Sequence, residues 1–241
     1  MTKSRAAFEN DLLKIFISAY KNDSGLKVIS RLYKGIQGIK IVDSTYIKQK
    51  WEKESNKCIP GEVWTKYCEF QWRISNSPLW RTFGWKTLCR YFITPAQSSH
   101  YSGTSSCWRN CGSQDANHSH VFWDCPKVHS FWRKIHLELE IIFGIKITFI
   151  WDELFFGLIS LTSVNITTKK LFGILSVAAR KAVTKKWVKP DSPSIKEWYD
   201  IIYKIYVMER ITFSLRLQDC KFEDIWKKWK MYISQRCLTY V

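Results

Sequence analysis

The chain of 241 residues carries none of the sequence motifs that usually mark catalysis. It has no glycine-rich phosphate loop, no His-Glu-x-x-His, no Gly-x-Ser-x-Gly and no adjacent pair of aspartates. Metal-dependent phosphoryl transfer needs clustered carboxylates to hold divalent cations, and the sequence offers none at suitable spacing. We therefore expect a protein that is not an enzyme and that has no small-molecule substrate.

Acidic residues are scarce relative to basic ones. The sequence has 21 Asp and Glu against 38 Lys and Arg, which gives a formal net charge of +17. Residues 1–106 contribute +9 and residues 107–241 contribute +8, so the charge is not confined to a tail. A folded chain with this excess is expected to bind polyanions, most commonly nucleic acid, with an anionic membrane surface as the other candidate.

The sequence also lacks a long uninterrupted apolar run and a disulfide pattern. The most apolar window, Ile141–Leu161, contains Lys146, Asp152 and Glu153, so we interpret it as buried core and not as a membrane span. Five cysteines are scattered without a spacing rule: Cys58, Cys68, Cys89, Cys220 and Cys237. No cationic-then-apolar leader opens the sequence. These absences predict an intracellular protein of a reducing compartment, nuclear, cytoplasmic or both, with no membrane partner.

What the sequence does contain is a concentration of metal-ligand residue types in CWRNCGSQDANHSHVFWDC, residues 107–125. Cys107 and Cys111 form a Cys-x3-Cys pair that can place two thiolates on one tight turn. Gly112 follows directly and supplies the backbone freedom that such a turn needs. The segment therefore begins with one half of a plausible metal site.

His120 and Cys125 return as the second pair, with four residues between them. Pro126 follows, which predicts that Cys125 lies at a helix N-terminus, where the helix dipole favours the thiolate that a metal requires. Four protein ligands leave no position open for water, so the site would be structural. The pattern predicts one structural zinc ion bound by Cys107, Cys111, His120 and Cys125.

His118 is a competing ligand, because it lies only two residues before His120. We rank it second, since the seven-residue step from His118 to Cys125 is longer than the usual spacing between the third and fourth zinc ligands. The alternative stays open on the sequence alone.

Apolar residues recur at helical spacing through most of the chain. The expected helices are Ala6–Tyr20, a weaker one over Leu26–Tyr33, Ser44–Glu54, one opened by Pro60, one from Pro78, Pro126–Phe143, Thr167–Lys189, one capped by Ser192 or Ser194, and Lys221–Ser234. Within Ser44–Glu54 we expect Tyr46 and Trp51 to be buried. The β-branched run Ile145–Ile150 suits a short strand or an extended link. The sequence predicts a mainly α fold, helical segments flanking a small Cys-Cys-His-Cys zinc knuckle, with at most one or two short strands.

Residues 94–106 are polar and small, which is typical of a connector. We therefore expect two domains. The first covers residues 1–94, and the second covers residues 107–241 and begins with the knuckle at 107–125.

Two of the expected helices carry cations with few carboxylates. The segment PLWRTFGWKTLCRYF from Pro78 combines an aromatic stripe with three cations, although such a stripe is usually core. Thr167–Lys189 holds seven cations and no acidic residue, more than a helix dipole at its last turn explains. We expect nucleic-acid contacts from Arg81, Lys86, Arg90, Arg109, Lys181, Lys185 and Lys186.

The motif CWRNCG, followed by HVFWDCPKVHSFWRKI, resembles the zinc-knuckle region near the C-terminal end of the replicase polyprotein of LINE-type non-LTR retrotransposons. Upstream, WEKE at 51–54 and SPLWRTFGWKTLCRYFITP resemble the helical segment after the reverse transcriptase in vertebrate members. Downstream, IKEWYDIIYKIYVMERITF resembles their extreme C-terminal domain. The resemblance covers most of the chain.

Carried over by position, the four predicted ligands match the Cys-Cys-His-Cys set of that family. One departure is that eight residues separate Cys111 from His120, where seven are expected, so a bulge or a role for His118 remains open. The resemblance implies a C-terminal remnant without the endonuclease and the polymerase aspartates. Its implied role is to help bind template RNA and target DNA during target-primed reverse transcription.

The expected partner is therefore RNA, with DNA as a second candidate. A competing interpretation is a structural or protein-interaction module, in which the knuckle ties two helical parts together and the positive charge serves solubility. Salt-dependent RNA binding separates the two interpretations.

Overall fold

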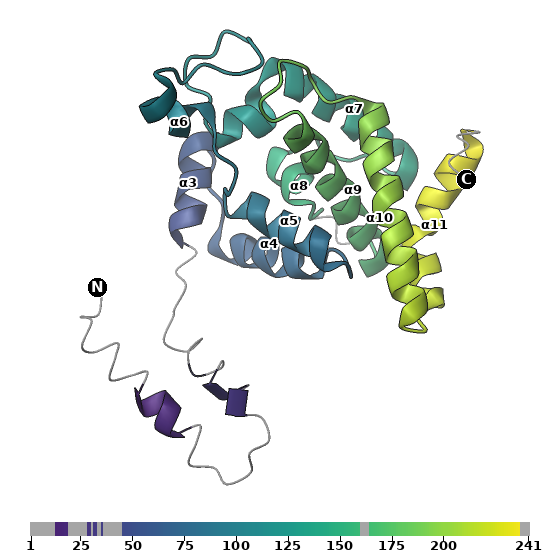
Figure 1. Cartoon of the computed structure of the whole chain (residues 1–241). Coiled ribbons are helices and arrows are strands. Elements are labelled where there is room, and N and C mark those ends of the chain that lie inside the picture. Colours follow the sequence, from purple (N-terminus) through teal and green to yellow (C-terminus); the bar gives the residue numbers. More distant parts are fainter. Residues whose placement is uncertain are drawn as a thin grey trace. The chain divides into compact units, whose positions relative to one another are not determined.

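The computed structural model describes residues 13–18, five residues between 28 and 35, 45–159 and 164–236 (Figure 1). Residues 13–18 are helical; the rest of the expected helix Ala6–Tyr20 lies outside the described residues, as does half of Leu26–Tyr33. The chain divides into two compact units, Met1–Tyr46 and Ile47–Val241. The second unit contains every predicted site residue.

The second unit is built from helices. They are α3 (Thr45–Ser55, which begins in the first unit), α4 (Gly61–Arg73), α5 (Pro78–Leu88), α6 (Pro95–Ser102), the π-helical turn η1 (His120–Asp124), α7 (Pro126–Phe143), α8 (Trp151–Phe156), α9 (Ile166–Lys185), α10 (Ile195–Leu215) and α11 (Asp219–Gln235). The described residues contain no strand, so the predicted mainly α fold is confirmed. None of the described helices is both long and apolar enough to cross a membrane.

The helix boundaries follow the predicted start signals closely. Pro60 precedes α4, and Pro78 and Pro126 each occupy the first turn of α5 and α7. Of the two candidate caps before α10, Ser194 is the one used. Its hydroxyl accepts the Glu197 backbone N–H at 3.1 Å, while the Glu197 carboxylate accepts the Ser194 N–H at 3.0 Å.

The polar stretch expected to be a connector contains α6. The Thr94 hydroxyl accepts the Gln97 backbone N–H at 3.3 Å, and the Gln97 side chain accepts the Thr94 N–H at 3.1 Å. Pro95 sits in the first turn and Gly103 ends the helix with a left-handed backbone, φ 69°. A capping box therefore outweighs the weak helix propensity of the serines, and the expected domain boundary falls within the second unit.

The run Ile145–Ile150 forms no strand. The Ile147 N–H donates to the Glu140 carboxylate at 3.0 Å, and the His136 ring N–H donates to the Ile147 carbonyl at 2.6 Å. Side chains of α7 thus satisfy the backbone groups that a strand would pair, and the run leads into the short helix α8.

Helix α9 is the centre of the second unit. It contacts α5, α7, α8, α10 and α11, and every residue from 171 to 180 is buried. The indole of Trp198 on α10 donates to the Leu175 carbonyl at 3.0 Å. Gly173 lets α4 approach closely, because a Cβ there would lie 2.5 Å from Cε1 of Phe70. The core therefore consists of helices packed around α9.

Helix α3 is attached to this core through Trp51. The Trp51 indole is buried, packs against Phe155 at 5.2 Å between ring centroids and donates to the Leu88 carbonyl at 2.9 Å. Tyr46, which was expected to be buried, is 60% exposed. Residues five apart lie about 140° apart around a helix, so Tyr46 and Trp51 do not share one face.

Candidate metal centre and the cations around it

The first two predicted ligands lie on one compact turn. The Cys107 N–H donates to the Ser113 carbonyl and the Asn110 N–H donates to the Cys107 carbonyl, each at 3.0 Å. Asn110 and Gly112 both adopt positive φ, 50° and 88°, which folds the chain sharply on either side of Cys111. This backbone turns both thiols of the Cys-x3-Cys pair toward the same point, as the sequence predicts.

The second pair is brought together by the π-helical turn η1. The Cys125 N–H donates to the His120 carbonyl at 2.9 Å, a bond that spans five residues and is diagnostic of a π-helix. Cys125 then stands directly before α7, and its carbonyl accepts the Val128 and His129 N–H groups. The predicted position of Cys125 at a helix N-terminus is confirmed.

The four predicted ligands converge. One ligand atom from each of Cys107, Cys111, His120 and Cys125 lies within 4.8 Å of all the others. The Cys111 sulfur is 3.3 Å from Nε2 of His120. Cys107 and Cys125 are buried, while Cys111 and His120 are half-buried. Three thiols and an imidazole at this separation could hold a metal ion, and the donor set is compatible with zinc.

Burial and hydrogen bonds shift the pKa values of three of the four candidate ligands. Burial raises the pKa of the Cys107 thiol to about 11. Burial also raises the pKa of Cys111, but hydrogen bonds from the Ser113 backbone and the two neighbouring thiols outweigh it, so the pKa lies below its ordinary value. Burial lowers the pKa of His120, which keeps the imidazole neutral and its lone pair available. Metal binding would therefore displace thiol protons.

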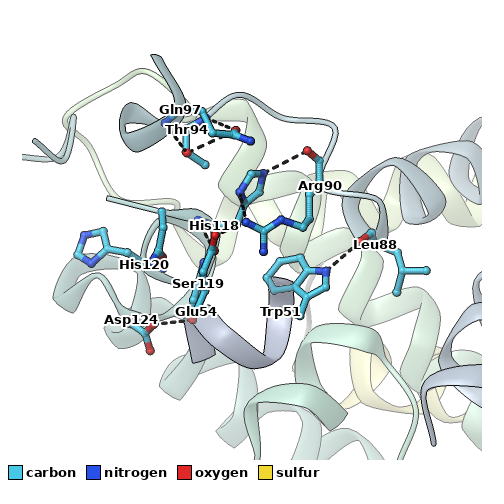
Figure 2. Close-up of polar contacts among 11 residues, drawn as sticks. Trp51, Glu54, Leu88, Arg90, Thr94, Gln97, His118, Ser119, His120 and Asp124 are labelled. Atoms are coloured by element: carbon cyan, nitrogen blue, oxygen red, sulfur yellow. Dashed lines mark hydrogen bonds and ion pairs between the residues drawn. The ribbon is translucent and has the colours of Figure 1, made fainter. Parts of the chain in front are cut away.

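His118 is not part of the cluster, and its ring contacts Arg90 (Figure 2). Its Nδ1 accepts from the Arg90 guanidinium at 3.1 Å, and its Nε2–H donates to the Arg90 carbonyl at 3.2 Å. The side chain is fully buried against Trp51, with ring centroids 6.0 Å apart. Both ring nitrogens are used by Arg90, so the structure places His120, and not His118, at the candidate metal centre.

Glu54 of α3 ties the knuckle to the helical unit. Its carboxylate forms an ion pair with Arg90 and accepts the backbone N–H groups of His118 at 3.0 Å and Ser119 at 3.3 Å. These contacts fix the backbone just before His120, whose own N–H donates to Asn117 at 2.9 Å. Sequence reasoning missed this role of Glu54, because 64 residues separate it from His118 and no local pattern connects them.

Three of the cations expected to contact nucleic acid are committed to the fold. Arg109 is fully buried, and its guanidinium donates to the Val121 carbonyl at 3.1 Å. The Arg90 side chain is 7% exposed and paired with Glu54. Lys186 lies 3.4 Å from the carboxylate of Glu197. Arg109 and Arg90 are therefore too buried to be the expected contacts, whereas Lys186 keeps some exposure beside its carboxylate partner.

Arg180, one of the seven cations of the expected helix Thr167–Lys189, is also inside. It is fully buried and donates to the side chains of Gln71 at 2.9 Å and Thr87 at 3.3 Å. Its guanidinium lies 5.4 Å from the Phe155 ring centroid. Burial lowers the pKa of Arg180 to about 9, so the group is still largely protonated at neutral pH. The positive charge of Arg180 therefore lies in the core and is not available at the surface of α9.

The other predicted contacts lie at the surface of α5 and α9. Lys86 and Lys185 are exposed, and Arg81 and Lys181 are half-buried. None of the four has a carboxylate within ion-pair distance in the described part of the chain.

Aromatic rings connect two of these cations. The Lys86 amine lies 4.6 Å from the ring centroid of Tyr91, and the Lys181 amine lies 5.0 Å from that of Phe83. Phe92 packs against both rings, at 6.1 Å and 5.9 Å between centroids. Lys185 lies one helical turn beyond Lys181. We call Lys86, Tyr91, Lys181 and Lys185 the basic aromatic face.

A comparison of the sequence with models of known protein families finds no match.

Proposed function

We propose that this protein is a non-catalytic nucleic-acid-binding module whose knuckle is held by one structural zinc ion. Its partner is RNA, with DNA as a second candidate, inside the cell. This proposal agrees with the role implied by the resemblance to the C-terminal region of LINE-type replicases. The single observation that carries it is the basic aromatic face, with three uncompensated cations and an exposed tyrosine.

Zinc fits the cluster by ligand chemistry. Thiolates and imidazole favour zinc over the hard cations calcium and magnesium, and four protein ligands close a tetrahedral shell. The cluster lies between the tight turn at Cys107 and the start of α7. In this proposal zinc fixes the fold of the knuckle and takes no part in chemistry.

The electrostatics of the basic aromatic face favour a polyanion. Burial lowers the pKa of Lys181, and the neighbouring charge of Lys185 lowers it further. A phosphate close to both amines would relieve this like-charge repulsion, because it supplies the missing negative charge. Tyr91 is 65% exposed beside Lys86 and offers a ring on which an unpaired base can stack.

The test is the salt dependence of binding to a single-stranded RNA of about 20 nucleotides. If roughly five phosphates are neutralised, the log-log slope should be near −3.5, from about −0.7 per contact. Changing Lys86, Lys181 and Lys185 together to Gln should flatten that slope by about two units. The matched control changes the exposed Lys196, Lys204 and Lys227 of α10 and α11 to Gln and should keep the parental slope.

An unchanged slope in the first triple variant would remove the basic aromatic face from the proposal. Binding that is absent, or indifferent to salt, in the folded parent would favour the second candidate, a protein-interaction module. That candidate is favoured by three exposed apolar side chains on α7 and α11: Leu137 (58% exposed), Ile141 (54%) and Met231 (53%).

A further inference from the structure

A second surface feature lies away from the knuckle, where α4 meets the start of α9. It is a hollow of about 440 Å³. Its wall contains Lys66, Phe70 and Arg73 from α4, Leu158 from the link after α8, and Ile166 and Lys170 from α9. The volume is within the range of small-molecule sites, roughly 300–1,000 Å³.

Three of these wall residues are cations without a partner of opposite charge. No carboxylate lies within ion-pair distance of Lys66, Arg73 or Lys170 in the ranges that the structure covers. Lys66 and Arg73 are seven residues apart on α4, so they project from the same side of the helix. Glu69 is the one carboxylate in the described wall. The hollow therefore carries net positive charge.

Lys170 is half-buried, and its amine lies 5.3 Å from the ring centroid of Phe213 on α10. Burial lowers its pKa; Glu209 partly offsets this effect, and Arg216 and Lys221 lower the pKa further. Glu209 is already used elsewhere, since it accepts hydrogen bonds from Ser75 and from the Asn76 N–H. A bound anion would supply the counter-charge that Lys170 lacks.

The remaining wall is apolar. Phe70 is held directly against the backbone of α9, because Gly173 has no side chain to displace it. Leu158 is half-buried beside it, and Ile166 is 76% exposed at the first position of α9. An aromatic ring and two aliphatic side chains next to three cations suit a ligand with one apolar or flat part and one anionic part.

We propose that this hollow binds a small organic phosphate of nucleoside monophosphate size, with the phosphate on Lys66, Arg73 and Lys170 and the flat group on Phe70, Leu158 and Ile166. Arg73 can hold two phosphate oxygens at once, while the lysines act as point charges. This inference goes beyond the proposed function and does not rest on it, because none of its residues belongs to the basic aromatic face. A free nucleotide or the terminal unit of a strand would present the same chemistry.

The experiment is isothermal titration of the full chain with adenosine 5′-monophosphate, and separately with inorganic phosphate and with adenosine. The monophosphate should bind at least about tenfold more tightly than inorganic phosphate or adenosine, since only the monophosphate contacts both the cations and the apolar part of the wall. The double variant Lys66→Gln/Arg73→Gln should weaken its binding by about tenfold or more. Ile166→Ser should weaken it several-fold, and Lys196→Gln/Lys204→Gln on α10 should leave it unchanged.

Three results would overturn the inference: no binding of the monophosphate by the folded parent, inorganic phosphate binding as tightly as the monophosphate, or adenosine doing so. A 5′-phosphorylated RNA decamer identifies the source of the phosphate. If the decamer competes for the hollow, even in the variant of the basic aromatic face, the ligand is a strand end; if it does not, the ligand is a free nucleotide. Because this readout needs no binding at the basic aromatic face, the two proposals can fail separately.

Discussion

The knuckle at 107–125 and helix α9 belong to the same unit, but different interactions stabilise them. In α9 every residue from 171 to 180 is buried, and the segment is regular helix throughout. In the knuckle only residues 118 and 119 are α-helical, Asn110 and Gly112 adopt positive φ, and the polar side chains of Arg109 and His118 are fully buried. Apolar packing accounts for most of the contacts of α9, with Arg180 as its buried cation, whereas specific polar contacts and four converging ligand atoms order the knuckle.

The two regions should therefore differ in how strongly one lost contact destabilises them. Packing energy is spread over many contacts, so one lost contact in α9 leaves many others. A metal site has few contacts, and each ligand contributes a large share of the binding free energy. We therefore expect loss of one metal ion to unfold the knuckle. We expect α9 to lose stability only when a substitution changes the volume of a buried side chain.

The largest expected effect is that of metal removal. Structural zinc contributes roughly 10–16 kcal/mol of binding in small zinc peptides, so chelation should unfold the knuckle locally. In hydrogen exchange, the N–H groups of Cys107, Asn110 and Val121, which donate within the knuckle, should lose protection by about 100-fold or more. The amides of residues 171–180 should stay protected. Equal losses in both regions would show that they unfold as one.

A smaller effect is expected where α3 holds the knuckle. Glu54→Ala leaves the guanidinium of Arg90 buried and unpaired, and it also removes the acceptor of two backbone N–H groups. We expect a loss of about 3 kcal/mol in the free energy of unfolding, measured by urea denaturation. Lys48→Ala, which breaks an i,i+4 pair with Glu52 on the same helix, is the matched control and should cost about 0.5 kcal/mol. Similar losses in the two variants would contradict the anchoring role of Glu54.

The third prediction concerns the packing of α9 against α4 at Gly173. Gly173→Ala should destabilise by about 1–3 kcal/mol, because its Cβ would meet Phe70 at 2.5 Å and Ile74 at 2.9 Å. Gly61→Ala in α4 has nothing within 4 Å of its new Cβ and should be neutral or gain up to about 1 kcal/mol. Both variants should retain the parental metal content. Loss of metal from Gly173→Ala would mean that the two regions are coupled more strongly than their contacts suggest.

The sequence predicted the features that depend on local signals. Pro126 predicted the start of α7 correctly, and the spacing of Cys107, Cys111, His120 and Cys125 predicted four residues whose ligand atoms do converge. The π-helical turn had no sequence signal, although it explains how a four-residue spacing brings His120 and Cys125 together.

The sequence could not predict which cations are buried and which are exposed, because this depends on partners far along the chain. Among the described residues Arg180 has no carboxylate within ion-pair distance, and it donates to Gln71, 109 residues away. Lys86 carries the same charge but remains at the surface. Net charge is a property of composition, whereas the exposure of each charge is decided by tertiary packing.

The most direct test of this account is the zinc content of the purified chain and of two single variants, measured by native mass spectrometry. The account predicts one zinc ion per parent chain, loss of that ion in His120→Ala, and retention in His118→Ala, because His118 is committed to Arg90. A parent that stays metal-free after reconstitution with zinc, or a His118→Ala variant that loses zinc while His120→Ala keeps it, would contradict the account.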